Sequence, residues 1–351
     1  MARWNSSNRR AWGSWQDSWN EGDEWTKDKS YRNDGYGRGG GGRGSHWRGR
    51  GQQRETAVLG EQNMGSVTST SSPSQLSFAA QELARLQISF CPDPGRGGFT
   101  ATYDSDPTAS ACGSVNAGSG RSLRVGGSGL NGQFAKDLAS AGQPVDEFQH
   151  VHSAMMRLAC SNPGQLQEGP PEVVRRHRGL AGCFARAANS NGNGLVIVDI
   201  LKEGLRPLHL ANVAMVYCVG PDRREYADDE SFLRDLTVLG ESLSRTCGLY
   251  NDFAGAAKDT ALPLLQRLRV GLVSGGKYAG RVAKPIVAGS LLEGLARGAL
   301  GVAPQSEDLA GSKLEFEFAY DEGVFEKAWQ SLCSAATTTV ESPVSDVSAQ
   351  Q

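Results

Sequence analysis

The chain has 351 residues, of which 38% are hydrophobic, and its 36 Lys and Arg against 38 Asp and Glu give a formal net charge of -2. Residues 205–219 are the longest apolar-rich stretch. Arg206, Pro207, His209 and Asn212 interrupt it, so it falls short of the ~18 uninterrupted apolar residues that indicate a membrane span. The first residues lack the apolar run of a secretory signal, and the seven cysteines have no metal-type spacing. We therefore expect an intracellular protein, nuclear or cytoplasmic, with reduced thiols, no metal and no membrane contact.

The charge is divided unevenly along the chain. Residues 1–54 hold 11 basic and 6 acidic side chains, and by subtraction the remainder holds 25 and 32, so an arm of +5 precedes a body of -7. Six of the seven Trp also lie in this arm, among Gly and Arg. Arg contacts phosphates and aromatic rings stack on unpaired bases. The arm resembles the Arg-Gly-Gly arms of RNA-binding proteins, and we expect RNA contacts from Arg38, Arg43, Trp47, Arg48 and Arg50. A disordered solubilising tail is the alternative.

The remaining chain separates into a domain and a tail. After a Ser/Thr-rich linker that ends at residue 73, an ordered domain is expected over 74–334, followed by a polar, frayed tail over 335–351. The predicted elements, in chain order, are a helix over 76–86, strands over 88–91 and 111–115, helices over 131–141, 148–159 and 171–188, strands over 195–201 and 213–219, a helix over 228–246, a strand over 267–273, a helix over 283–297, a strand over 313–320 and a helix over 323–333. Strands that alternate with helices of this length predict an α/β sheet with helices on both faces.

A first glycine-rich turn follows the strand that ends near Asn116. After a loop, Gly126, Gly127, Ser128 and Gly129 lead directly into an amphipathic helix. Glycine lets backbone N–H groups approach an anion, and the helix N-terminus adds the positive end of its dipole. The turn therefore predicts a phosphate or diphosphate site, although a tight loop without a ligand would have the same composition.

A second glycine-rich turn follows the apolar strand over 267–273. It contains Ser274, Gly275, Gly276, Lys277 and Tyr278. Loops after the carboxyl ends of neighbouring strands face the same crevice in an open α/β sheet. We therefore expect the two turns to clamp a diphosphate from opposite sides, with Tyr278 packed on a sugar or a base.

Four stretches, in order, resemble the macro domain family. Cys112-Gly-Ser-Val-Asn-Ala and the first glycine turn are similar to the family pattern Val-Asn-Ala-Ala-Asn followed by Gly-Gly-Gly-Val-Asp-Gly, and the second turn to Ser-Thr-Gly-Ile-Tyr-Gly. Residues 216–222 are similar to the central strand ending in Val-Gly-Pro, and residues 314–325 to the last strand and helix. The resemblance spans Cys112 to Trp329. It implies a three-layer α/β/α macro-like domain with a mixed, mostly parallel central sheet.

The resemblance also implies a ligand, ADP-ribose, free or attached to a protein or nucleic acid, with no further cofactor. It places Asn116 near the distal ribose, and Asp104 or Asp106, respectively 12 and 10 residues before Asn116, near the adenine amino group. Either Asp could instead cap a turn next to Pro107. Around the diphosphate it places Gly126, Gly127, Ser128, Gly129 and Leu130 on one side, and Ser274, Gly275, Gly276, Lys277 and Tyr278 on the other.

Two departures from the family bear on catalysis. Ser119 stands where the family has its second Asn, and Asn131 stands where the hydrolase branch has an Asp. Asn116 and Asn131 are therefore the candidate catalytic residues, but an amide cannot take a proton from water. We expect a binder of ADP-ribose coupled to an RNA-binding arm. The alternatives are a mono-ADP-ribosyl or O-acyl-ADP-ribose hydrolase assisted by its substrate, and an RNA-associated scaffold with a degenerate nucleotide site.

Other polar residues give weaker signals. His150 and His152 lie on different sides of a predicted helix, which argues against a shared metal. His177 has no partner at ligand spacing, which is typical of a surface or structural histidine. Arg175, Arg176 and Arg178 form a basic run that predicts a solvated helix face, with nucleic-acid contact as the alternative.

Overall fold

The computed structural model describes residues 80–92, 112–117, 123–127, 129–205, 212–257, 261–301, 314–321 and 323–338. All of them belong to one compact unit that extends from Thr70 to Gln351. Its elements are α2 (Ala80–Leu83), β1 (Gln87–Pro92), β2 (Cys112–Ala117), α3 (Gly129–Ser140), α4 (Val145–Ser161), β3 (Gln167–Glu168), α5 (Pro171–Arg176), β4 (Leu180–Arg186), β5 (Val196–Leu201), η4 (Glu203–Leu205), β6 (Asn212–Cys218), η5 (Arg223–Glu225), α6 (Asp229–Ala257), β7 (Arg267–Val270), η6 (Lys277–Ala279), α7 (Lys284–Gly301), β8 (Glu315–Asp321) and α8 (Val324–Thr338).

The strands form one eight-stranded sheet in the order β1-β8-β7-β2-β6-β5-β4-β3. The pairs from β1 through to β6 are parallel, and those from β6 to β3 are antiparallel. The predicted α/β class and the mixed, mostly parallel sheet are therefore confirmed.

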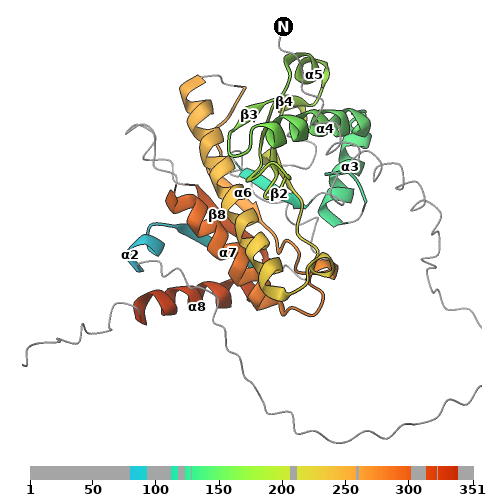
Figure 1. Cartoon of the computed structure of the whole chain (residues 1–351). Coiled ribbons are helices and arrows are strands. Elements are labelled where there is room, and N and C mark those ends of the chain that lie inside the picture. The colour runs from blue at the N-terminus through green and yellow to red at the C-terminus, as the bar shows by residue number, and fades with distance from the viewer. Residues whose placement is uncertain are drawn as a thin grey trace, which may run out of the picture. The chain divides into compact units, whose positions relative to one another are not determined.

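Helices cover the sheet on two sides, with α6 and α7 on one and α3 and α4 on the other (Figure 1). The sequence of strand β5 shows why both faces of the sheet are covered. Val196, Val198 and Ile200 point to α6 and α7, whereas Ile197 and Leu201 point to α3 and α4. Because successive side chains of a strand alternate in direction, a strand that is apolar throughout must be covered on both faces.

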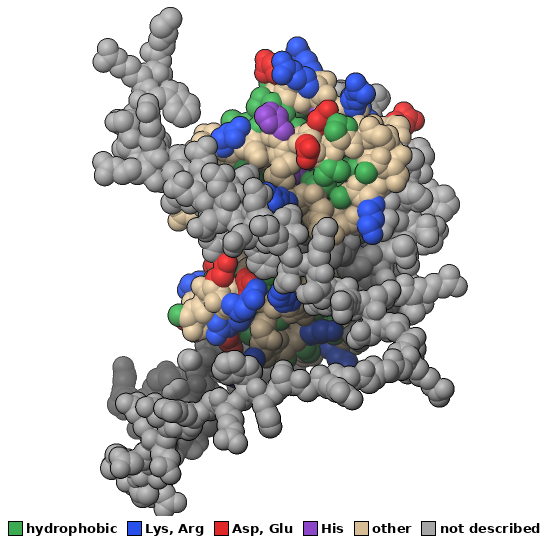
Figure 2. Space-filling view, turned by 90° about the vertical axis from the view of Figure 1, so that its right-hand side faces the viewer, with side chains coloured by type: hydrophobic (Ala, Val, Ile, Leu, Met, Phe, Trp, Pro, Cys, Tyr) green, Lys and Arg blue, Asp and Glu red, His purple; other side chains and the backbone are tan. Residues whose placement is uncertain are grey.

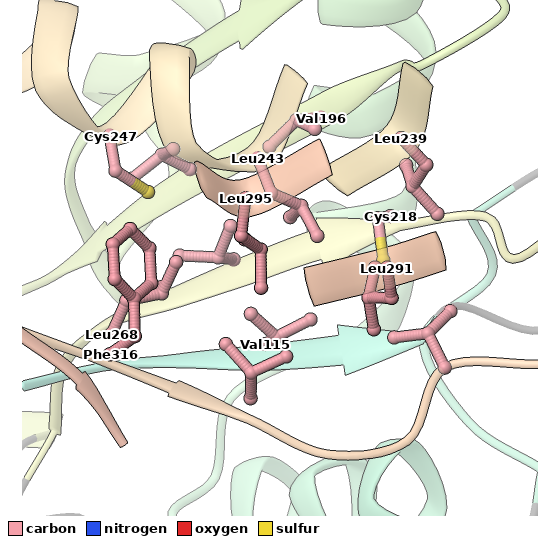
Figure 3. Close-up of a cluster of buried hydrophobic side chains, with 14 of the residues drawn as sticks. Val115, Val196, Cys218, Leu239, Leu243, Cys247, Leu268, Leu291, Leu295 and Phe316 are labelled. Carbon is pink, nitrogen blue, oxygen red and sulfur yellow. The ribbon is translucent and has the colours of Figure 1, made fainter. Parts of the chain in front are cut away.

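The layer beneath α6 and α7 is apolar. Figure 3 shows Leu239 and Leu243 of α6 and Leu291 and Leu295 of α7 above the strands that carry Val115, Leu268 and Phe316. The two helices also pack closely on each other, because Gly294 of α7 lies against the backbone of α6, where a Cβ atom would overlap the carbonyl oxygen of Thr237.

Strands β7 and β8 carry charged residues on the face of the sheet opposite to α6 and α7. Arg267 lies 3.1 Å from both Glu315 and Glu317, and Arg269 lies 3.0 Å from Glu317. Alternation therefore gives these strands one apolar side, occupied by Leu268 and its neighbours, and one side of paired charges.

One predicted element is of the wrong type, and two are shorter than predicted, because in the described residues the helix expected over 76–86 covers Ala80–Leu83 and the strand expected over 267–273 ends at Val270. Residues 171–188 do not form a single helix, because α5 ends at Arg176 and residues 180–186 form β4, paired antiparallel to β5. Almost every residue of β4 is buried, and such an apolar run has no periodicity that separates a buried strand from a buried helix. The small Gly182 leaves room for the side chains of Leu262 and of its strand neighbour Phe184.

Within the described chain, no helix is long and apolar enough to span a bilayer.

Candidate functional site

Three turns leave the same edge of the sheet. Strand β2 lies between β6 and β7 and is parallel to both, so the carboxyl ends of all three strands point the same way. The segment after β2 leads to the first glycine-rich turn and α3, that after β6 contains Gly220 and η5, and that after β7 contains Ser274 and η6. This is the edge at which open α/β sheets bind ligands.

The first turn requires glycine at three positions. Gly126 and Gly127 have φ angles of 129° and 91°, which side chains with a Cβ atom rarely adopt. In the first turn of α3, a Cβ atom on Gly132 would overlap the carbonyl oxygen of Gly127. The turn is therefore folded directly against the N-terminus of α3, where backbone N–H groups lack intrahelical partners.

Asn131 holds this turn from α3. Its side chain is 3% exposed, and Nδ2 donates hydrogen bonds to the carbonyl oxygens of Arg124, at 2.6 Å, and Gly126, at 2.7 Å. Both amide hydrogens are thus used on the backbone. A carboxylate at this position could not donate either bond, so the Asn suits a structural role.

A buried polar network holds the same turn from the other side. Nδ1 of His152, on α4, lies 3.1 Å from the carbonyl oxygen of Leu123, and Nε2 lies 2.7 Å from Oδ2 of Asp199 on β5. The thiol of Cys183, on β4, donates to Oδ1 of the same Asp199 at 3.1 Å. All four of these residues are fully buried, and Leu123 has a φ of 50°.

The two contacts suit a protonated imidazole. A carbonyl and a carboxylate both accept hydrogen bonds, and an imidazolium can donate to both at once, one from each ring nitrogen. Burial by itself lowers the pKa of His152. The charge of Asp199 and the hydrogen bonds to Asp199 and Leu123 more than offset this effect and raise the pKa above its ordinary value. Burial and the neighbouring Asp199 also raise the pKa of Cys183, so its thiol stays protonated.

The turns after β6 and β7 are joined to each other. Ser274 has a φ of 60°, and its Oγ donates to the carbonyl oxygen of Pro221 at 2.8 Å. Gly220 lies so close to Ser274 that it has no room for a Cβ atom. Asp222 accepts hydrogen bonds from the backbone and side chain of Arg224, and these lower its pKa. The two turns form one packed unit.

The predicted site residues are placed as follows. Asn116 is the residue before the last of β2 and pairs with Tyr217 of β6. Gly129 and Leu130 begin α3. In the second turn Ser274 and Gly275 are buried, Lys277 is exposed and Tyr278 is half-buried. The positions that lie outside the described residues are Arg38, Arg43, Trp47, Arg48, Arg50, Asp104, Asp106 and Ser128.

The sequence interpretation missed the network around Asp199. It had one visible signal, because Asp199 is the only charged residue in the otherwise apolar strand β5, and a buried carboxylate needs a partner. His150 and His152 do lie on different sides of α4, the first exposed and the second buried. His177 is buried rather than superficial, with Nδ1 accepting from the backbone N–H of Gly179.

The surface of the described residues carries mixed charge. Figure 2, turned toward the side of α3 and α4, shows basic and acidic side chains interspersed. Arg175, Arg176 and Arg178 are exposed. No group of three or more His, Cys, Asp or Glu suited to a metal occurs among the residues with described positions. An anion at the sheet edge would therefore be held by local N–H groups and not by bulk charge.

The fold and the edge define an α/β domain with a mixed sheet and glycine-rich turns after its central strands. No family model matches the chain. It is similar to the "DNA/RNA-binding protein ALBA4" of Plasmodium falciparum (isolate 3D7), with 30% identity over 245 residues, which covers 66% of this chain and 62% of that protein. The protein of the same name from Plasmodium yoelii yoelii is 27% identical over 266 residues, or 72% and 67% of the two chains. "Mitochondrial association factor 1 form b0" of Toxoplasma gondii is 28% identical over 227 residues, or 59% and 50%.

Among solved structures, the chain is similar to a mutant macrodomain of Oceanobacillus iheyensis with ADPR. The identity is 16%, the match covers 63% of this chain and 86% of the macrodomain, and the TM-score is 0.34. A likeness of this size does not assign the chain to that family.

Proposed function

We propose that this protein binds nucleic acid through its N-terminal arm and ADP-ribose, free or attached to a macromolecule, through the turns at the carboxyl edge of its sheet. The observation that carries the second part is the convergence of three turns from adjacent parallel strands on one edge. The family resemblance of the same three stretches supports the choice of ligand. The names of the two Plasmodium relatives support nucleic-acid binding, and the Arg, Gly and Trp content of residues 1–54 supports the choice of the arm.

In this proposal the diphosphate lies between the two glycine-rich turns. The N–H groups at the start of α3 contact it from one side, and the backbone of the second turn contacts it from the other. Lys277 adds an exposed positive charge, and the half-buried ring of Tyr278 packs against a sugar or the base. The family resemblance places Asn116 near the distal ribose.

Binding is favoured over hydrolysis by the hydrogen bonds of Asn131. Its amide hydrogens are directed to the carbonyl oxygens of Arg124 and Gly126, so they are not available to orient a water. With no acid or base at this position, the site suits recognition of the modification and not its removal.

Calorimetry tests the nucleotide site. The full chain should release heat with ADP-ribose and bind AMP more weakly, because AMP lacks the diphosphate and the distal ribose. Lys277→Ala and Tyr278→Ala should weaken binding, whereas Lys327→Ala, which removes an exposed Lys from α8, should not. No heat at millimolar ADP-ribose from a chain with a native circular dichroism spectrum would reject the site. Equal affinity in all three variants would place the ligand elsewhere.

Fluorescence anisotropy with single-stranded RNA tests the arm. Changing Arg38, Arg43, Arg48 and Arg50 to Ala in the full chain should weaken binding and flatten the dependence of log K on log salt by about 0.7 per lost contact. The matched change of the same four residues to Lys keeps the charge. It should restore the salt slope but not the full affinity, because Lys does not stack on bases. An unchanged salt slope in the Ala variant would exclude the arm as the binding element.

A further inference from the structure

The buried network below the first glycine-rich turn has no function in the proposal above. It connects three elements that are distant in sequence, α4, β5 and β4, to a single backbone carbonyl, that of Leu123. Ion pairs with no exposure are costly unless their remaining hydrogen-bonding atoms are satisfied. Here they are satisfied by the thiol of Cys183 on one side and by the loop on the other.

We infer that His152 and Asp199 are positioning residues for the glycine-rich turn, and that protonated His152 holds Leu123 in the backbone conformation from which Gly126 and Gly127 reach their ligand-binding geometry. The part that concerns the ligand rests on the proposed function. The part that concerns the loop does not.

The conformation of Leu123 is the first reason. A non-glycine residue with φ of 50° is strained by roughly 1–2 kcal/mol and persists only where its surroundings impose it. Two contacts do so here. Leu123 is 0% exposed in the core formed with α3 and α4. The carbonyl oxygen of Leu123 accepts a hydrogen bond from Nδ1 of His152.

The position in the loop is the second reason. Leu123 directly precedes Arg124, and the turn begins at Gly126. Asn131 donates hydrogen bonds to the carbonyl oxygens of Arg124 and Gly126. His152 and Asn131 therefore fix four consecutive residues, 123–126, from opposite ends. Asn131 moves with α3, whereas His152 ties the turn to the sheet through Asp199. The second tie links the turn directly to β5.

The network also makes this tie dependent on pH. The groups that face His152 are Asp199 from β5, with Cys183 beyond it on β4, the Tyr217 ring from β6 at 4.5 Å, and the more distant His177. Loss of either imidazole proton leaves two acceptors facing each other, either the ring and the Leu123 carbonyl or the ring and Asp199. The turn should therefore loosen, and ligand affinity should fall, as pH rises through the titration of His152.

Hydrogen exchange of the full chain, measured by mass spectrometry on peptides that cover the first turn, tests the inference. His152→Phe removes both bonds and keeps a ring of similar size in the core. Exchange of the turn should become at least about fivefold faster, because the net loss of one hydrogen bond gives this factor and Asp199 also loses its buried partner. Leu291→Ala, on the opposite face of the sheet, is the control for a general loss of stability and should not change the turn selectively.

Asp199→Asn separates charge from geometry. An Asn amide can donate to Nε2 of a neutral imidazole, whose Nδ1 proton then still reaches Leu123. In this variant the turn should stay protected, but its dependence on pH, after correction for intrinsic exchange, should disappear. This variant also replaces His152→Phe as the test if the latter fails to fold.

The outcomes are distinct. If exchange of the turn is unchanged in His152→Phe, or if its pH dependence is the same in Asp199→Asn and the wild type, the inference is wrong. If both variants behave as expected but the wild type shows no heat with ADP-ribose, the positioning role stands and the proposed ligand is wrong. If ADP-ribose binds the wild type and His152→Phe with equal affinity, the turn is positioned without His152, and the inference fails while the proposed function survives.

Discussion

The two faces of the sheet are built for different tasks. The face under α6 and α7 is a continuous apolar layer, whereas the face under α3 and α4 encloses the ion pair of His152 and Asp199 and contacts the glycine-rich turn through Leu123. Apolar contacts are adaptable and hydrogen bonds are directional. The face under α3 and α4 also has an apolar core, and the directional hydrogen bonds added to that core hold the loop in its strained conformation.

Among the substitutions that test the difference between the two faces, Asp199→Ala should lower the free energy of unfolding the most. It leaves His152 charged and unpaired in the interior, at a cost of about 3 to 5 kcal/mol in the free energy of unfolding. The loss should shrink at high pH, where the imidazole becomes neutral. Urea denaturation at several pH values measures it. A loss that does not vary with pH would show that the two residues are not an ion pair.

Leu291→Ala should come next and act only on the apolar face. Leu291 is fully buried between α7 and the sheet, and its truncation should cost about 3 kcal/mol at every pH. The same denaturation series checks this. If its cost varied with pH as strongly as that of Asp199→Ala, the division between the two faces would not hold.

Asn131→Ala should cost less, about 2 kcal/mol for two hydrogen bonds to the backbone. Its effect should be concentrated in the turn, since both acceptors lie there. Exchange rates of peptides from the turn and from α7 compare the local and the distant effect. Equal acceleration in both would mean that Asn131 supports the whole domain and not the turn in particular.

The smallest effect is the pH dependence of the wild type. His152 has a raised pKa in the folded state, so its stabilising contribution is complete below its ordinary value of 6.5 and is lost as pH rises through the folded pKa. Burial lowers the pKa of His177, so its contribution has the opposite sign and grows as pH rises toward 6.5. Stability should pass through a maximum near this pH, with slopes below about 1.4 kcal/mol per unit for each group. His152→Phe should remove the loss of stability that His152 causes on the alkaline side.

The sequence predicts the face under α6 and α7 well, but it does not predict the polar network on the face under α3 and α4. Strand β5 and the helices α6 and α7 follow from apolar periodicity, although α6 extends further than expected, to Ala257. Strand β4 was assigned to a helix because Leu180–Arg186 carries apolar residues on both sides. In the site, glycine spacing located both turns. The partners of Asp199 could not be predicted, because Cys183 and His152 meet it only through tertiary packing.

The pairing of the first strand with β8 has a consequence for synthesis. Gln87 aligns with Glu315, 228 positions later in the chain, and among the described strands β1 pairs with β8 alone. At a translation rate of about 5 to 20 residues per second, β1 leaves the ribosome roughly 10 to 50 seconds before its partner exists. The strand that is synthesised first is therefore among the last to join the sheet. Until β8 is made, the unpaired edge of β1 must not pair with other exposed strands.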